Sequence, residues 1–65
     1  MNANKLKGVI VERGLTQQDV AKMIGITPKT FYQKMKSGNF GLDEVEIMIA
    51  GLSINNPAEI FLSNE

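Results

Sequence analysis

The sequence predicts an all-α fold in which five short helices form one domain over residues 1–65. Apolar side chains recur three or four residues apart along most of the chain, which is the spacing of one helix face. Residues that start helices, and glycines that end them, separate these stretches. A chain of 65 residues has room for one domain only, because a chain of this size buries only about 60% of its unfolded surface.

The first helix is expected from about residue 5 to residue 13, with Asn4 as its N-cap. Val11 falls outside the apolar stripe of this helix and is expected at the surface. Gly14 should end the helix, because glycine adopts the left-handed conformation without a Cβ penalty. The residues expected to face the core are Leu6, Val9, Ile10 and the aliphatic stem of Arg13.

The second helix is expected to begin after Thr16. Asp19 follows three residues later, which is the spacing of a capping box, and its carboxylate suits the positive N-terminal end of a helix. Gly25 should end this helix in the left-handed conformation. The core-facing residues at helical spacing are Val20, Ala21 and Ile24.

The third helix is expected to follow at once. Thr27 is a suitable N-cap, and Pro28 fits the first helical position because its missing N–H costs nothing there. Phe31 and Met35 mark the inner stripe, and residues 37–39 should stop the helix. Two helices joined by a short turn that contains glycine form a helix-turn-helix, whose second helix can enter the major groove of DNA.

The fourth helix is expected from residue 42 to about residue 52, after Phe40 has anchored the connection in the core. Gly41 is a tolerable N-cap, and Glu44 stands at the third helical position. Ile47 does not fit the apolar stripe and should be at least partly exposed. The residues expected to face the core are Leu42, Val45, Met48, Ile49 and Leu52.

A fifth helix is predicted by a complete start signal, in which Asn56 is the cap, Pro57 is first and Glu59 is third. Three large apolar residues follow, and they cannot all face one core because a helix turns by about 100° per residue. At least one of them is therefore expected at a surface. These residues are Ile60, Phe61 and Leu62.

Four residues carry a resemblance to a known family. Gln17, Ala21, Gly25 and Ile26, spaced four, four and one apart, resemble the helix-turn-helix of the phage Cro/repressor (lambda repressor-like) family. The resemblance covers about residues 5–62 and implies that Gln17 binds a DNA phosphate. The chain departs from the family at Lys34, where an aliphatic residue is usual.

The resemblance implies a sequence-specific regulator of transcription. Its partner would be double-stranded operator DNA, bound through the third helix, and two copies would place their third helices in successive major-groove turns. We therefore expect a Cro-like repressor of a phage or prophage, located in the bacterial cytoplasm at the nucleoid.

The outward side of the third helix carries side chains whose chemistry suits a DNA groove. Lysine can donate to guanine, glutamine can pair with adenine, and threonine can meet a phosphate or a thymine methyl group. Lys34 and Lys36 lie later in the helix, where it leaves the groove, and so suit phosphates. The expected DNA-binding residues are Gln17, Thr27, Lys29, Thr30, Tyr32, Gln33, Lys34, Lys36 and Asn39.

Several of these residues have plain structural alternatives. Thr27 caps its helix whatever else it does, and Asn39 belongs to the helix stop. Lys29 and Gln33 fit an ordinary polar surface, and Tyr32 fits a packed surface aromatic equally well. Lysines of the first helix, Lys5 and Lys7, can add charge at the edge of the DNA-contacting surface, although solvation explains them as well.

The charges are divided between the two halves of the chain, although the net charge is zero. Residues 1–36 hold all seven basic residues and two acids, a formal charge of +5, whereas residues 37–65 hold five acids and no base, a charge of −5. This asymmetry indicates a basic binding face and an acidic remote face. The alternative is that two solvated faces differ by chance.

Composition excludes several other functions. The chain has no cysteine and no histidine, which removes disulfides, thiolate nucleophiles, imidazole bases and Cys/His zinc sites. Capping and solvation explain the carboxylates of residues 43–46, and the sequence has no glycine-rich phosphate loop. No apolar run approaches the roughly 18 residues of a membrane span. We therefore expect no enzyme activity, cofactor, metal, small-molecule substrate or membrane partner.

The apolar residues left outside the stripes predict self-association through the acidic half. A weak homodimer is expected, because exposed apolar groups that cluster often mark an interface. An alternative function is a protein-binding module that uses the same fold to modulate another regulator. The expected interface residues are Ile47, Ile60, Phe61 and Leu62.

Overall fold

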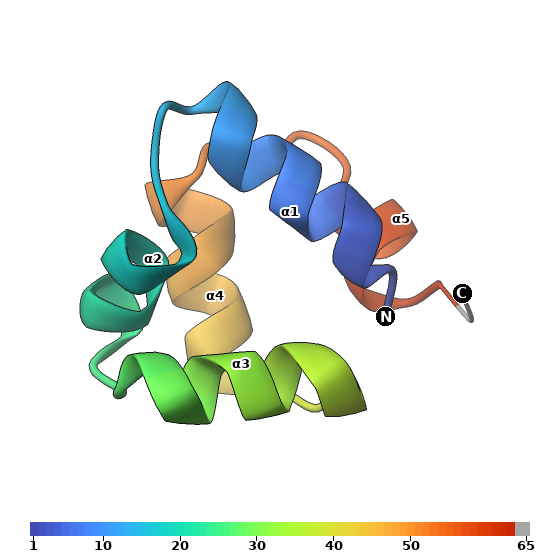
Figure 1. Cartoon of the computed structure of the whole chain (residues 1–65). Helices are drawn as coiled ribbons and strands as arrows, with labels where there is room; N and C mark the ends of the chain where they lie inside the picture. The colour runs from blue at the N-terminus through green and yellow to red at the C-terminus, as the bar shows by residue number, and fades with distance from the viewer. Residues whose placement is uncertain (64–65) are drawn as a thin grey trace.

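The computed structural model describes residues 1–63, which fold into five α-helices and contain no strand (Figure 1). The all-α prediction is confirmed. Residues 64 and 65, which belong to the predicted domain and to the acidic half, lie outside the described part. The helices are α1 (Ala3–Glu12), α2 (Gln17–Ile24), α3 (Pro28–Ser37), α4 (Leu42–Gly51) and α5 (Pro57–Phe61).

The start of α1 corrects the sequence prediction. Asn2, not Asn4, is the N-cap, and its Oδ1 accepts the N–H of Lys5 at 3.1 Å. The reason is tertiary, because the N–H of Asn2 also donates to the carbonyl of Ile60 at 2.7 Å and holds this residue outside the helix, against α5. At the other end, Gly14 adopts a φ of 73°, as expected for a glycine that follows a helix.

The predicted boundaries of α2 and α3 are confirmed. Thr16 and Asp19 form a reciprocal capping box, with bonds of 2.8 and 3.1 Å between each side chain and the other's N–H. Gly25 ends α2 in the left-handed conformation, and residues 25–27 are the whole connection to α3. Thr27 caps α3 by accepting the N–H of Thr30 at 3.2 Å.

The core contains side chains from every helix, and the burial of each large one stabilises the fold by about 1.5–3 kcal/mol. Val11 is exposed and Ile47 is partly exposed, as predicted. The buried residues are Leu6, Ile10, Val20, Ala21, Ile24, Phe31, Met35, Met48, Leu52, Ile54 and Ile60.

One expectation for α4 is wrong, whereas at α5 Asn56 occupies the predicted N-cap position but makes a different hydrogen bond. Leu42 was expected to face the core but is 73% exposed, because it is the first residue of α4 and lies before the turn that reaches the core. The side chain of Asn56 does not accept a capping hydrogen bond. Its Nδ2 donates instead to a carboxylate oxygen of Glu59, within the same first turn.

Arg13 joins the end of α1 to the end of α4. Its Nε donates to the carbonyl of Leu52 at 2.7 Å, and its Nη2 donates to the carbonyl of Ser53 at 3.2 Å. A guanidinium suits this position, because the carboxyl end of a helix carries unpaired carbonyls and partial negative charge. Arg13 is exposed and is not part of the core as expected, but it links two helices through these hydrogen bonds.

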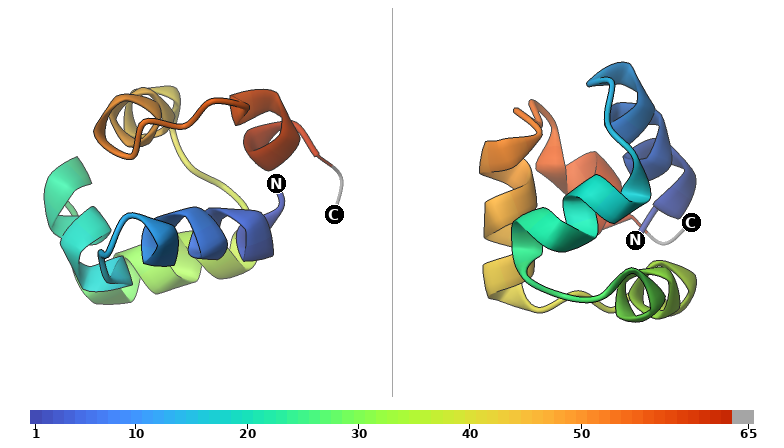
Figure 2. Two further views of the ribbon diagram at one scale, coloured as in Figure 1. Left: turned by 90° about the horizontal axis from the view of Figure 1, so that it is seen from above. Right: turned by 60° about the vertical axis from the view of Figure 1, so that its left-hand side comes forward.

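Helix α3 lies along one side of the molecule, and the other four helices lie to one side of it (Figure 1 and Figure 2). No other helix lies beyond it in Figure 1 or in the right-hand view of Figure 2. In the left-hand view of Figure 2, α4 and α5 lie along one side and α1 lies along the other. Within residues 1–63, no helix is long and apolar enough to cross a bilayer.

Candidate functional site

The outward face of α3 is polar and open. Phe31 and Met35 are buried and fix the rotation of the helix. The hydroxyl of Thr27 donates to Thr30 Oγ1 at 2.9 Å, which leaves the hydroxyl hydrogen of Thr30 available to another acceptor. The exposed polar residues on α3 and at its ends are Thr27, Lys29, Tyr32, Gln33, Lys36, Ser37 and Asn39.

A cleft beside this face brings together side chains from three helices. Lys7 comes from α1, Gln17 is the first residue of α2, and Tyr32 and Lys36 come from α3. Ala3 and Met35 complete the lining. Two lysines, a glutamine and a tyrosine thus line a cleft to which the described residues contribute no carboxylate, a set whose side chains suit the oxygens of a phosphate.

Lys7 lines this cleft, although the sequence predicted for it only a place at the edge of the DNA-contacting surface. Ala3 and Lys7 are four residues apart on α1 and therefore share a face. That spacing is a weak signal, because only the packing of α1 against the rest of the chain shows that this face borders α3. Gln17, by contrast, was identified from its motif.

Three lysines of this region make no ion pair within the described residues: Lys7, Lys29 and Lys36. Lys5 differs, because its Nζ lies 3.5 Å from a carboxylate oxygen of Glu59 on α5. The basic and acidic halves of the sequence therefore touch at some points. Besides these three lysines on or beside α3, Lys22 on α2 also makes no ion pair within residues 1–63.

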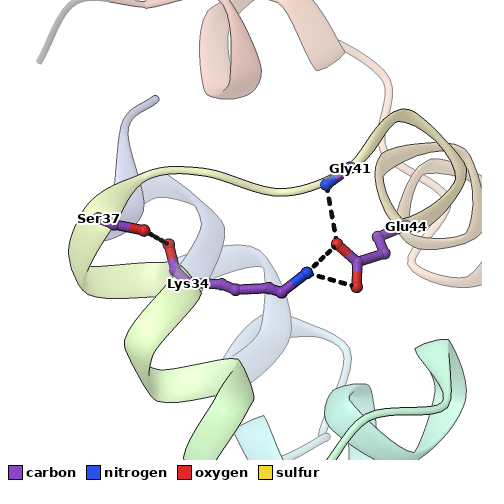
Figure 3. Close-up of polar contacts among 4 residues, drawn as sticks. All are labelled: Lys34, Ser37, Gly41 and Glu44. Carbon is purple, nitrogen blue, oxygen red and sulfur yellow. Dashed lines mark hydrogen bonds and ion pairs between the residues drawn. The ribbon is translucent and has the colours of Figure 1, made fainter.

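Lys34, one of the predicted DNA-binding residues, is already ion-paired within the chain. Its Nζ donates to both carboxylate oxygens of Glu44, at 2.8 and 2.9 Å, and so it is not a free cation on the α3 face (Figure 3). Hydrogen bonds from Lys34 and then from the N–H of Gly41 hold the pKa of Glu44 below its ordinary value. The sequence placed Lys34 late in α3 correctly, but it did not reveal the ion pair with Glu44, ten residues away.

A second surface feature is an apolar groove between α4 and α5, whose exposed lining is almost entirely carbon. Phe61 is half-buried in it and Leu62 is 81% exposed, which agrees with the expectation that one of the last three apolar residues faces outward. The groove is lined by Val45, Ile49, Pro57, Ala58, Phe61 and Leu62.

The predicted interface residues are only partly brought together there. Ile60 is 1% exposed and belongs to the core, because it faces inward on α5, so its assignment to an interface is wrong. Ile47 is partly exposed but does not line the groove. Val45 and Ile49 were expected to face the core. Both are half-buried and line this groove, and Ile49 also packs against the core.

Residues 1–63 contain no cluster of three carboxylate, imidazole or thiol groups that could hold a metal ion. The comparisons with known proteins also contribute no assignment. Models of protein families, curated proteins and solved structures gave no match to this chain.

Proposed function

We propose that this chain is a sequence-specific double-stranded DNA-binding regulator that inserts α3 into a major groove. In this proposal α2 and α3 form a helix-turn-helix of the Cro/repressor type, and the protein represses transcription by occupying an operator in a bacterial cell. The observation that carries the proposal is the cleft of Lys7, Gln17, Tyr32 and Lys36 directly beside the exposed polar face of α3.

The proposed division of labour follows from position. The cleft residues bind phosphates, which supplies affinity and sets the register of the protein on the duplex. Lys29 and Gln33 are exposed four residues apart on α3 and read base edges, guanine through the lysine and adenine through the glutamine. No catalysis and no cofactor are part of this function.

Two copies would bind a pseudo-palindromic operator. A two-fold dimer would join the α4–α5 grooves of both subunits and space the two copies of α3 by about 34 Å, one turn of DNA. The groove is small, so the dimer is weak in solution and becomes complete on DNA. This arrangement keeps the acidic residues of α4 and α5 away from the phosphates.

The test is a titration of duplexes of random sequence at several salt concentrations. Each phosphate contact contributes about 0.9 to the slope of log K against log salt. Lys36→Met should lower that slope by about 0.9, whereas Lys22→Met, an exposed lysine of α2 that does not line the cleft, should leave it unchanged. Affinity that does not depend on salt would contradict the proposal. If affinity falls with salt as expected, selection from a random pool identifies the operator.

The apolar groove supports a second candidate function, in which the chain binds and modulates another regulator protein. In that case partner binding would depend on groove residues such as Leu62 and would vary little with salt. Binding that depends on Lys36 and falls with salt favours the first proposal.

A further inference from the structure

The connection between α3 and α4, residues 38–41, is held by hydrogen bonds to Lys34 at its start and to Glu44 at its end. At its start, the carbonyl of Lys34 accepts the N–H of Gly38 at 2.8 Å and the N–H of Asn39 at 3.2 Å. At its end, Glu44 Oε1 accepts the N–H of Gly41 at 2.8 Å. The Lys34–Glu44 ion pair joins these two fixing points (Figure 3).

The Lys34–Glu44 ion pair is better placed to contribute to the free energy of unfolding than the Lys5–Glu59 pair. The Lys34 and Glu44 side chains are 31% and 15% exposed, and both carboxylate oxygens accept a bond from the ammonium. The Lys5–Glu59 pair has one contact of 3.5 Å between side chains that are more than half exposed. Charged hydrogen bonds that are shielded from water contribute more than solvated ones.

The packing of the connection points in the same direction. Phe40, between the two fixing points, lies 5.5 Å from Phe31 of α3, measured between ring centroids. Ser37, the last residue of α3, also donates its hydroxyl to the Lys34 carbonyl at 3.2 Å. The last turn of α3 and the connection that follows it are therefore one braced unit, with Lys34 at its centre.

We propose that Lys34 and Glu44 form a positioning pair, which sets the last turn of α3 and the connection against α4. Resting on the proposed DNA-binding function, the pair orients Lys36 and Asn39 toward the DNA backbone without itself touching a phosphate. Lys34 thus acts through its neighbours. The usual aliphatic side chain at this place would pack but would not bridge to the first turn of α4.

The opposing account is that Lys34 leaves Glu44 and binds a phosphate directly. The two accounts give opposite signs for Glu44→Gln. A positioning pair is weakened by this change, so DNA affinity falls, whereas a phosphate ligand is released by it, so affinity rises. Glu46→Gln is the matched control, because Glu46 is exposed on the same helix and removes the same charge without touching the pair.

The experiment measures amide hydrogen exchange and DNA binding of the full chain for five variants: Lys34→Met, Lys34→Arg, Glu44→Gln, Glu46→Gln and the double variant that combines Lys34→Met with Glu44→Gln. Lys34→Met and Glu44→Gln should speed exchange of the Asn39 and Gly41 amides by roughly tenfold, the scale of one charged hydrogen bond. Lys34→Arg, which keeps a donor for the carboxylate, should stay near the parent, as should Glu46→Gln.

For DNA, we expect Lys34→Met and Glu44→Gln to weaken binding about equally, and the double variant to be no weaker than either single variant, since residues that act as a unit are not additive. The salt slope should stay at the parent value. A slope lowered by about 0.9 in Lys34→Met, or tighter binding by Glu44→Gln than by Glu46→Gln, would overturn the proposal.

The exchange measurement separates this inference from the function on which it rests. A parent chain that binds no DNA would refute the DNA-binding proposal. Unchanged exchange at Asn39 and Gly41 in both Lys34→Met and Glu44→Gln would refute the positioning pair, whatever the parent binds.

Discussion

The face of α3 and the groove between α4 and α5 are both uncovered, but they differ in almost every chemical respect. The α3 face and its cleft offer Lys7, Lys29 and Lys36 without ion-pair partners among residues 1–63, together with amide and hydroxyl groups. The groove offers carbon, with Leu62 its most exposed large side chain. The first surface suits a polyanion and the second suits another apolar surface.

A net charge of zero therefore does not show how charged groups are distributed over the surface of the folded chain. Two of the lysines of the basic half, Lys5 and Lys34, are paired with acids of the other half. Of the lysines without an ion pair among residues 1–63, Lys7, Lys29 and Lys36 lie on or beside α3, and Lys22 lies on α2. Several of the exposed apolar residues lie on α4 and at the end of α5. Folding thus gives one neutral chain two exposed surfaces of different chemistry.

The largest expected effect comes from removing charge from the α3 cleft. Lys7→Met combined with Lys36→Met should lower the salt slope by about 1.8 and weaken binding to every duplex by tenfold or more at moderate salt, because two phosphate contacts are lost. Fluorescence anisotropy over a salt series measures both quantities. An unchanged slope in a folded double variant would remove the phosphate role of the cleft.

The next effect concerns the groove. Leu62→Ser should leave half-site binding intact but weaken binding of two copies to a palindromic site by about tenfold, because each copy loses roughly 1 kcal/mol or more of apolar burial. Sedimentation with and without the site gives the stoichiometry. Since Leu62 is 81% exposed, the change should leave the free energy of unfolding nearly unchanged, and a palindrome bound equally well would reject the groove as the dimer contact.

A smaller and more local effect is expected at Gln33. Gln33→Ala should relax the preference at one base position by about 1–3 kcal/mol while binding to random DNA persists. Comparison of operators that differ at single positions measures this. An equal loss on every sequence would reassign Gln33 to the backbone.

The smallest effect is on the pH dependence of stability. Because the pKa of Glu44 is lowered in the folded state, the stability that it contributes is present above its ordinary pKa and is lost as pH falls through the lowered value. Thermal unfolding from neutral to acidic pH should therefore show a smaller loss of stability for Glu44→Gln than for the parent, by less than about 1 kcal/mol. Identical acid profiles would contradict the assigned ion pair.

Features that depend on neighbouring residues were predicted well from the sequence. Thr16, Asp19 and Gly25 bound α2 as expected, because a capping box and a left-handed glycine are decided within one helical turn. The same reasoning placed Thr27 and Pro28 at the start of α3. Helical spacing also identified the buried residues of the first three helices.

Features that depend on distant partners were missed. Asn4 was the expected N-cap of α1, but Asn2 is the N-cap in the structure, where its N–H also donates to a carbonyl of α5. Lys34 has the side-chain chemistry of a phosphate ligand, but its ammonium group donates to the carboxylate of Glu44 on another helix. Lys7 joins the cleft only because α1 packs beside α3, which no local pattern encodes.

Chemical-shift mapping of the amide spectrum tests most directly whether α3 and the adjacent cleft bind DNA. The chain is titrated with a short duplex that contains a selected site. We predict that the shifts are largest at α3 and at the residues around Lys7 and Gln17, and that they shrink as salt is added. Groove residues should respond only when the duplex carries two half-sites. Shifts confined to the α4–α5 groove, or none at the α3 face, would contradict the account.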